Sequence, residues 1–300
     1  MSEKLECAVP SERYSQELLL TFSGEEYRHF LATGGQALRP RLARSLELAA
    51  LEPGMRVLDI GCGRGEAVLH ALWRGAEVVG VDYAGAPLRL TAHTLKLASS
   101  QEQGRVALGR ADATRLPFAD GAFDRVLMLD LVEHLHPWQL RLTLGEARRV
   151  LRSGGYLVLH SVPNRWALRY GYPLLRLFWP HLPASPRSPY EEEVHVNEQD
   201  LLSLREGLRQ AGLAAAIWLE DWTTVQAVWQ TGRRFADALR EEGYPLLRRP
   251  ALRALAALLM RTPLRLILAN DLYAIAWPAG REAPPVARVP CLERLITGLA

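Results

Sequence analysis

Residues 56–65 read RVLDIGCGRG, and the apolar-patterned run Glu66 to Trp73 follows them. An apolar run interrupted only by Asp59, then glycines at every second position, then a helical pattern predict a strand, a tight turn and a helix. Glycine tolerates positive φ and lets the backbone approach a ligand closely, and a helix start leaves N–H donors free. The stretch therefore predicts a ligand-binding turn, although a βα turn that merely needs glycine has the same pattern.

The charge around this turn favours a cationic ligand. The dinucleotide fingerprint requires Gly-x-Gly-x-x-Gly, but here Glu66 stands at the sixth position and the third glycine, Gly65, falls one place early. The carboxylates of Asp59 and Glu66 suit a ligand with a positive group better than a pyrophosphate. S-adenosylmethionine (SAM) carries a sulfonium and an ammonium, and residues 57–65 resemble motif I of the class I SAM-dependent methyltransferases. A nicotinamide-dependent oxidoreductase is disfavoured.

A second apolar run, Glu77 to Asp82, ends in a carboxylate about twenty residues beyond the glycine turn. The two hydroxyls of a ribose require a bidentate acceptor at the end of the neighbouring strand, where Asp82 is placed. The run resembles motif II of the same family, which implies ribose binding by Asp82 and contact between Tyr83 and the adenine.

Two further stretches strengthen the resemblance. Residues 109–113 stand where the family places an acidic residue that accepts from the adenine amino group, and Asp112 and Ala113 match. Residues 116–124, LPFADGAFD, resemble a segment of the methyltransferases of ubiquinone and menaquinone biosynthesis. With the end of the fourth strand beside the methionine part of SAM, the implied cofactor residues are Asp59, Gly61, Cys62, Gly63, Gly65, Asp82, Tyr83, Asp112, Ala113, Asp130 and Leu131.

Strands and helices alternate along most of the chain. Beyond the first two strands, the predicted strands are 105–108, 125–130, 156–160, 214–219 and 272–277, and the main helices are 86–99, 138–150 with a glycine stop at 151–155, and 201–211. Alternation implies a parallel sheet with right-handed crossovers. The resemblance implies an α/β, Rossmann-like, seven-stranded sheet, mostly parallel with the last strand antiparallel, with helices on both faces and helical insertions over the substrate side.

The predicted organisation is an N-terminal helical cap (1–45), a methyltransferase domain (46–277) and a C-terminal linker and tail (278–300). Within the cap, Tyr27, His29 and Phe30 either cover the cofactor or pack on the sheet edge. Residues 161–199 are rich in proline and aromatic residues, and an insertion of this length is normally functional or disordered. The aromatic content disfavours disorder, so the segment is interpreted as a substrate lid.

The insertion at 222–270 contains arginines spread among leucine and alanine. These arginines interrupt every window of the roughly twenty apolar residues that a membrane-spanning helix needs. Either a basic amphipathic face contacts a membrane or a lipid-like substrate, or the helices pack over the substrate side with solvated arginines. Both interpretations stay open.

Composition narrows the possibilities further. The 300 residues carry a net charge of +3, which does not favour a nucleic-acid partner. Cys7, Cys62 and Cys291 are odd in number and far apart, so we expect no disulfide framework, no metal site and a reducing compartment. The first residues have no apolar signal region, so a cytoplasmic location is expected. The oligomeric state is not predicted.

Methyl transfer from a sulfonium is an in-line displacement, which mainly requires positioning in a dry pocket, and a hydroxyl acceptor also benefits from a general base. His134 and His195 are the candidate bases, with His160 weaker, although each is also compatible with a structural role. The predicted function is SAM-dependent methylation of a small molecule, preferably O-methylation of a lipid, sugar or natural product. The alternative is a catalytically silent SAM-binding or partner-binding protein.

Overall fold

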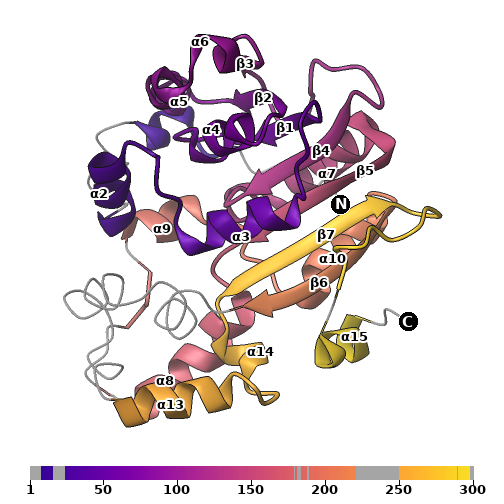
Figure 1. The fold of residues 1–300 in the computed structure, drawn as a ribbon. Coiled ribbons are helices and arrows are strands. Elements are labelled where there is room, and N and C mark those ends of the chain that lie inside the picture. Colours follow the sequence, from indigo (N-terminus) through magenta and orange to yellow (C-terminus); the bar gives the residue numbers. More distant parts are fainter. Residues whose placement is uncertain are drawn as a thin grey trace.

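The computed structural model describes residues 8–15, 24–178, 180, 184–187, 189–220, 250–288 and 290–297. Its seven strands form one sheet in the order β3-β2-β1-β4-β5-β7-β6, in which β7 runs antiparallel to both of its neighbours (Figure 1). The strands are β1 Arg56–Ile60, β2 Glu77–Asp82, β3 Val106–Arg110, β4 Phe123–Leu129, β5 Leu151–Ser161, β6 Leu213–Glu220 and β7 Asp271–Pro278. The predicted mostly parallel seven-stranded sheet is confirmed.

Helices cover both faces of this sheet. The apolar sides of α3, α4 and η2 pack on one face, and those of α7 and α10 pack on the other. The described helices are η1 Ser11–Tyr14, α2 Gly24–Thr33, α3 Pro40–Leu48, α4 Glu66–Trp73, α5 Gly85–Thr94, η2 Leu95–Leu97, α6 Ser100–Gln103, η3 Val132–His134, α7 Pro137–Val150, η4 Ala167–Gly171, α8 Tyr172–Phe178, α9 Pro189–Val194, α10 Leu201–Gln210, α13 Pro250–Leu259, α14 Arg265–Leu268 and α15 Cys291–Thr297.

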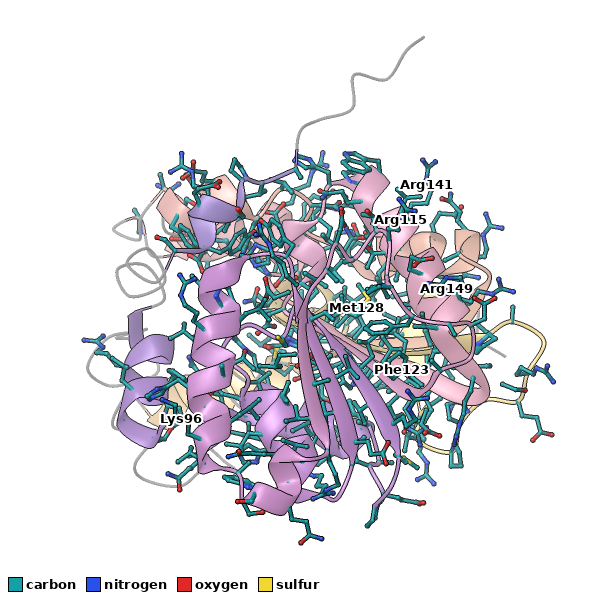
Figure 2. All side chains as sticks on the ribbon, turned by 90° about the horizontal axis from the view of Figure 1, so that it is seen from above. Lys96, Arg115, Phe123, Met128, Arg141 and Arg149 are labelled. Atoms are coloured by element: carbon teal, nitrogen blue, oxygen red, sulfur yellow. The ribbon has the colours of Figure 1, made fainter. Side chains whose placement is uncertain are left out.

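The core lies along the central strands. Phe123 and Met128 of β4 are almost fully buried, and Figure 2 shows them inside the molecule, whereas Lys96 lies at its outer edge. Every residue of β4 is buried, as expected for a strand covered by helices on both faces.

Several predicted boundaries were wrong. The glycine stop at 151–155 is instead the start of β5, which follows α7 directly. A Cβ on Gly155 would lie 2.8 Å from the carbonyl oxygen of Asp124, so glycine is needed there for close strand approach, beside an irregularity in the β4–β5 register. The helix predicted over 86–99 ends at Thr94 and is followed by η2, and β4 ends one residue before Asp130.

The strand order predicts where a ligand binds. The chain proceeds from β1 outward to β3 and then returns to β4 on the other side of β1, so the order reverses between β1 and β4. Ligands of open α/β sheets bind at the carboxyl ends of the strands at such a reversal. The predicted lid contains η4, α8 and α9, and the 222–270 insertion is described from residue 250 onward, as α13 and α14.

Candidate active site

The glycine turn after β1 has the conformation that its sequence predicts. Gly61, Gly63 and Gly65 have φ values of 76°, 53° and 81°, in the left-handed region that favours glycine. The N–H groups of Gly61 and Cys62 donate to the carbonyl oxygen of Val81 at 2.8 and 3.0 Å, which fixes the turn to β2. A Cβ on Gly63 would meet nothing closer than 3.8 Å, so the turn borders open space at that point.

Two carboxylates flank this space. Asp82, at the end of β2, accepts the N–H of Ala84 at 2.9 Å and the N–H of Gly63 at 3.3 Å. Asp59 is only 2% exposed, and burial together with the nearby Asp82 raises the pKa of Asp59 to about 7. Burial also raises the pKa of Asp82. A cationic ligand group near Asp59 would favour its ionised form.

Glu66 has one carboxylate oxygen engaged by a cation. Its Oε2 lies 2.9 Å from Nε of Arg64, whose guanidinium lies 5.5 Å from the ring centroid of Phe30. Arg64 offsets the charge of Glu66, whereas Oε1 of Glu66 has no hydrogen-bond partner among the residues described; the contribution of Glu66 to cation binding stays a prediction. Phe30 is buried against Leu90.

The other two residues of the predicted cap are His29 and Tyr27, and His29 shows no contact with the glycine turn among the described contacts. Nε2 of His29 lies 2.9 Å from the carbonyl oxygen of Ala37, within the cap itself. The side chain of Tyr27 falls outside the described residues. Whether the cap residues cover the cofactor stays a prediction.

The structure brings the predicted adenine-side residues to the ends of β2 and β3. The hydroxyl of Tyr83 donates to the carbonyl oxygen of Val9 at 2.8 Å, and its ring lies edge-to-face with that of Tyr14. Asp112 is exposed, and its Oδ1 accepts the N–H and the hydroxyl of Thr114, both at 2.8 Å. Ala113 follows directly. Their adenine-binding roles stay predictions.

Asp130 lies at the centre of a buried charge network. It has a φ of 54° directly after β4, and its carboxylate contacts Nδ1 of His160 and lies 3.2 Å from Nε of Arg41. Nε2 of His160 lies 3.0 Å from Oδ1 of Asp271. Burial opposes charge on Asp130, but Arg41 and His160 outweigh it and hold the pKa of Asp130 well below its usual range.

The same network removes His160 from the candidate bases. Burial alone would lower its pKa, but Asp130 and Asp271 outweigh burial and raise the pKa of His160 to about 9. At neutral pH both ring nitrogens therefore carry protons, and both N–H groups donate hydrogen bonds to the two carboxylates. The weak prediction of His160 as a base is wrong, because a protonated imidazole has no free lone pair.

His134 lies in η3, just beyond Leu131, whose side chain would be 3.0 Å from a Cβ on Gly61 of the glycine turn. Nδ1 of His134 lies 3.1 Å from the hydroxyl of Tyr14 and 3.2 Å from the carbonyl oxygen of Val194. A carbonyl only accepts, so the Val194 contact requires a proton on Nδ1 and leaves the lone pair on Nε2.

His195 completes this group. Its ring lies edge-to-face with that of His134 at 4.8 Å between centroids. Burial lowers the pKa of His134 to about 4, and burial together with His134 lowers the pKa of His195 to about 3. Both rings are thus neutral at physiological pH. The structure brings the two predicted catalytic histidines together from positions 61 residues apart in the sequence.

Glu133, which the sequence-based prediction missed, fixes this pairing. Its carbonyl oxygen accepts the N–H groups of Val196 and Asn197 at 2.9 and 3.1 Å, which holds the segment after α9 against η3. Its carboxyl is 1% exposed and accepts from the hydroxyl of Ser161 at 2.8 Å. Burial and Asp130 raise the pKa of Glu133 to about 8.

Glu133, His134 and His195 each offer a potential metal-ligand atom within 4.8 Å of the others. A neutral imidazole and a carboxylate are ordinary metal ligands. The expectation of no metal stays a prediction.

Comparison with known proteins gives the class. Residues 58–159 match the family described as "Methyltransferase domain". The demethylmenaquinone methyltransferase of Parafrankia sp. (strain EAN1pec) is 32% identical over 205 residues, which cover 62% of this chain and 76% of that protein. The chain belongs to the class I SAM-dependent methyltransferases, and SAM is the cofactor of that family.

Within this class the chain is also similar to the nocamycin O-methyltransferase of Saccharothrix syringae, with 34% identity over 145 residues, covering 46% of this chain and 50% of that protein. The chain spans about half the length of this and other curated relatives that it matches.

The fold is shared with the solved phosphoethanolamine N-methyltransferase 2 of Haemonchus contortus in complex with SAM. The TM-score is 0.59 at 17% identity, covering 92% of this chain and 61% of that one. No helix among the described residues of our chain is long and apolar enough to cross a membrane.

Proposed function

We propose that this protein transfers the methyl group of SAM to a hydroxyl group of an apolar or amphipathic small molecule, with His134 as the general base. The observation that carries this proposal is the neutral His134 ring beside the glycine turn, with Nδ1 oriented by Tyr14 and Val194 so that the lone pair is on Nε2. The implied SAM residues, from Asp59 to Leu131, belong to the same proposal.

The acceptor oxygen attacks the methyl carbon in line with the departing sulfur. The new O–C bond forms as the S–C bond breaks, SAM becomes S-adenosylhomocysteine, and the hydroxyl proton moves to Nε2 of His134. As the oxygen gains the methyl group it becomes positively charged, so its proton becomes far more acidic than that of an alcohol. A base whose pKa is about 4 therefore suffices at this stage.

Two observations support an apolar acceptor. The names of the relatives assign methylation of demethylmenaquinone and nocamycin to those proteins, which is consistent with quinone-like or natural-product acceptors here. In addition, Trp166, which is half-buried, packs against the main core at the start of the proposed lid. Apolar walls exclude water from the reacting methyl group.

The test measures binding and turnover separately. SAM should raise the melting temperature by mass action, whereas NADH should not. Formation of S-adenosylhomocysteine is then followed by mass spectrometry with matched hydroxyl, amine and carbon acceptors on the same apolar scaffold. We expect turnover with the hydroxyl series and its loss in His134→Ala. Binding of SAM without turnover on any scaffold would support the silent-binder alternative, and a response to NADH alone would reject the assignment.

A further inference from the structure

Two parts of the chain share an unusual charge pattern. Residues 162–190 and 243–270 contain several arginines and no aspartate or glutamate. Among the described residues, Arg165, Arg187 and Arg265 pair with acidic side chains from elsewhere in the fold. Arg169, Arg176 and Arg261 form no ion pair with any residue that the structure describes; Arg169 and Arg261 are exposed, and Arg176 is half-buried.

Hydrogen bonds join these two parts into one unit. The side-chain amide of Asn164, which is fully buried, donates to the carbonyl oxygens of Leu266 and Ala269 at 3.0 and 2.9 Å. The N–H of Asn164 donates to the carbonyl oxygen of Asn270 at 2.9 Å. The start of the first part is therefore fixed to α14 at the end of the second.

Close backbone packing strengthens this union. A Cβ on Gly171 would lie only 1.7 Å from the carbonyl oxygen of Ile267, so η4 can approach α14 this closely only with glycine at that position. Helices α8, α13 and α14 accordingly lie together at the lower end of the view in Figure 1.

This unit exposes large apolar side chains of a kind that folded proteins normally bury. Eleven large apolar side chains are exposed among the described residues, and six of them belong to these two parts, so the exposure is concentrated here. Leu177 of α8 is 77% exposed and Leu258 of α13 is 60% exposed. The spacing of Leu174 from Leu177, and of Leu255 from Leu258, places each pair on one helix face. The six residues are Tyr170, Leu174, Leu177, Leu255, Leu258 and Leu264.

We propose that these six side chains, together with Arg169, Arg176 and Arg261, form a basic apolar surface that docks on an anionic membrane. Helices that lie in a membrane interface bury apolar side chains among the acyl chains and present arginines to the phosphates. Arginine is well suited to this because its long stem covers apolar surface while its guanidinium stays at the headgroups. The absence of acidic residues from both parts removes the repulsion that an anionic headgroup layer would otherwise meet.

The charge pattern also favours a membrane over a second copy of this chain as the partner of this surface. A second copy of this chain would bring two arginine-rich surfaces together, which is unfavourable, whereas an anionic bilayer complements the surface. Docking there would hold the proposed lid, which begins with the same residues, at the bilayer surface. The inference goes beyond the proposed function and does not depend on which acceptor is methylated.

The primary test is co-sedimentation of the full chain with vesicles, without SAM or acceptor. The two compositions are phosphatidylcholine alone and an equimolar mixture of phosphatidylcholine and phosphatidylglycerol. We expect at least a roughly fivefold larger bound fraction on the anionic vesicles, decreasing as salt is added, because each arginine near the surface contributes to the attraction. Equal binding to both compositions, or binding to neither, would overturn the proposal.

Matched variants locate the surface. Leu177→Asp combined with Leu258→Asp should lower binding to anionic vesicles at least tenfold, and Arg169→Glu combined with Arg261→Glu should do the same. Leu142→Asp combined with Leu202→Asp changes two leucines that are also exposed, on α7 and α10, and should leave binding unchanged.

All variants should retain the wild-type melting temperature and SAM affinity, because the altered side chains are exposed. Equal losses in the α7 and α10 control would contradict the proposed location. A concentration-dependent dimer that disappears in Leu177→Asp would assign the surface to a second copy instead. The vesicle experiment measures no methyl transfer. Failure of the proposed reaction would therefore not affect the membrane proposal, and failure of membrane binding would not affect the proposed reaction.

Discussion

Nε2 of His160 lies 3.0 Å from Oδ1 of Asp271, and neither side chain is exposed to solvent. The other ring nitrogen of His160 contacts Asp130, so one imidazolium joins the end of β4 to the start of β7. Removing a single partner of a buried ion pair leaves an uncompensated charge, which is strongly destabilising. His160 therefore stabilises the site by holding Asp130 in place beside η3.

This arrangement predicts a pH-dependent stability. The pKa of His160 is raised to about 9 from an unfolded value near 6.5, so the folded state binds the proton more tightly. The stabilisation is fully present below about pH 6.5 and is lost as the pH rises toward 9. We expect the free energy of unfolding to fall over this window by on the order of 3 kcal/mol, measured by denaturant titration.

The variant His160→Gln provides the control, since an amide still forms hydrogen bonds but does not titrate. It should be less stable than the wild type at pH 6.5, and its stability should change less between pH 6.5 and 9. A wild-type slope that persists in His160→Gln would assign the titration to another group, such as Glu133.

SAM affinity should also depend on pH, through Asp59. Its pKa of about 7 means that it is largely protonated below neutrality, whereas a cationic ligand requires the carboxylate. The dissociation constant should thus be roughly tenfold higher at pH 6 than at pH 8, as ionisation of one group with this pKa dictates. Calorimetry at both values checks this, and Asp59→Asn should bind weakly at both. A flat wild-type profile would place the cation elsewhere.

The proposed ribose contact of Asp82 calls for two substitutions. Asp82→Ala should cost about 1–3 kcal/mol of SAM affinity, because it removes a charged hydrogen-bond acceptor. Asp82 also accepts the N–H groups of Gly63 and Ala84, so the alanine variant loosens the glycine turn as well. Asp82→Asn keeps one acceptor oxygen for the turn but loses the charge. Unchanged affinity in both variants, measured by calorimetry, would move the ribose acceptor to another residue.

The parts of the fold that were predictable depend on local chemistry. The glycine turn follows from positive φ at Gly61, Gly63 and Gly65, and the sheet follows from the apolar runs and their spacing. The boundary error at 151–155 has a local cause too: Gly155 is needed for close strand approach, and the sequence alone does not distinguish that from a helix stop.

The parts of the site that could not be predicted from the sequence depend on tertiary contacts. Tyr14 reaches His134 across 120 positions of the chain, and Arg41 reaches Asp130 from a helix that precedes the sheet. No spacing rule connects such residues. The ion pair of Glu66 with Arg64 could have been predicted, because the two residues are near neighbours in the sequence. Its geometry, however, depends on how α4 begins.

Metal removal tests the expectation that no metal is required. Glu133, His134 and His195 are close together, and because Nδ1 of His134 is engaged by Tyr14 and Val194, only Nε2 of that ring could bind an ion. We expect dialysis against EDTA to leave both SAM affinity and turnover unchanged, and added Zn²⁺ or Mg²⁺ to give no stimulation. Loss of turnover on EDTA treatment, with recovery on adding one metal, would show that this cluster binds a functional ion.

The role of His195 is the most discriminating question about the acceptor side. Its Nδ1 is buried and makes no hydrogen bond with any described residue, while its ring packs edge-to-face on His134. We expect His195→Ala to lower turnover about tenfold or more with SAM affinity nearly intact, since a lost hydrogen bond of roughly 1.4 kcal/mol corresponds to a tenfold change. His195→Phe retains a ring that can pack on His134 but lacks the nitrogens, and should be equally impaired if a nitrogen contacts the acceptor. Recovery of turnover in His195→Phe would show that the ring only supports His134, and parallel loss of SAM binding and turnover, or loss of neither, would make His195 structural.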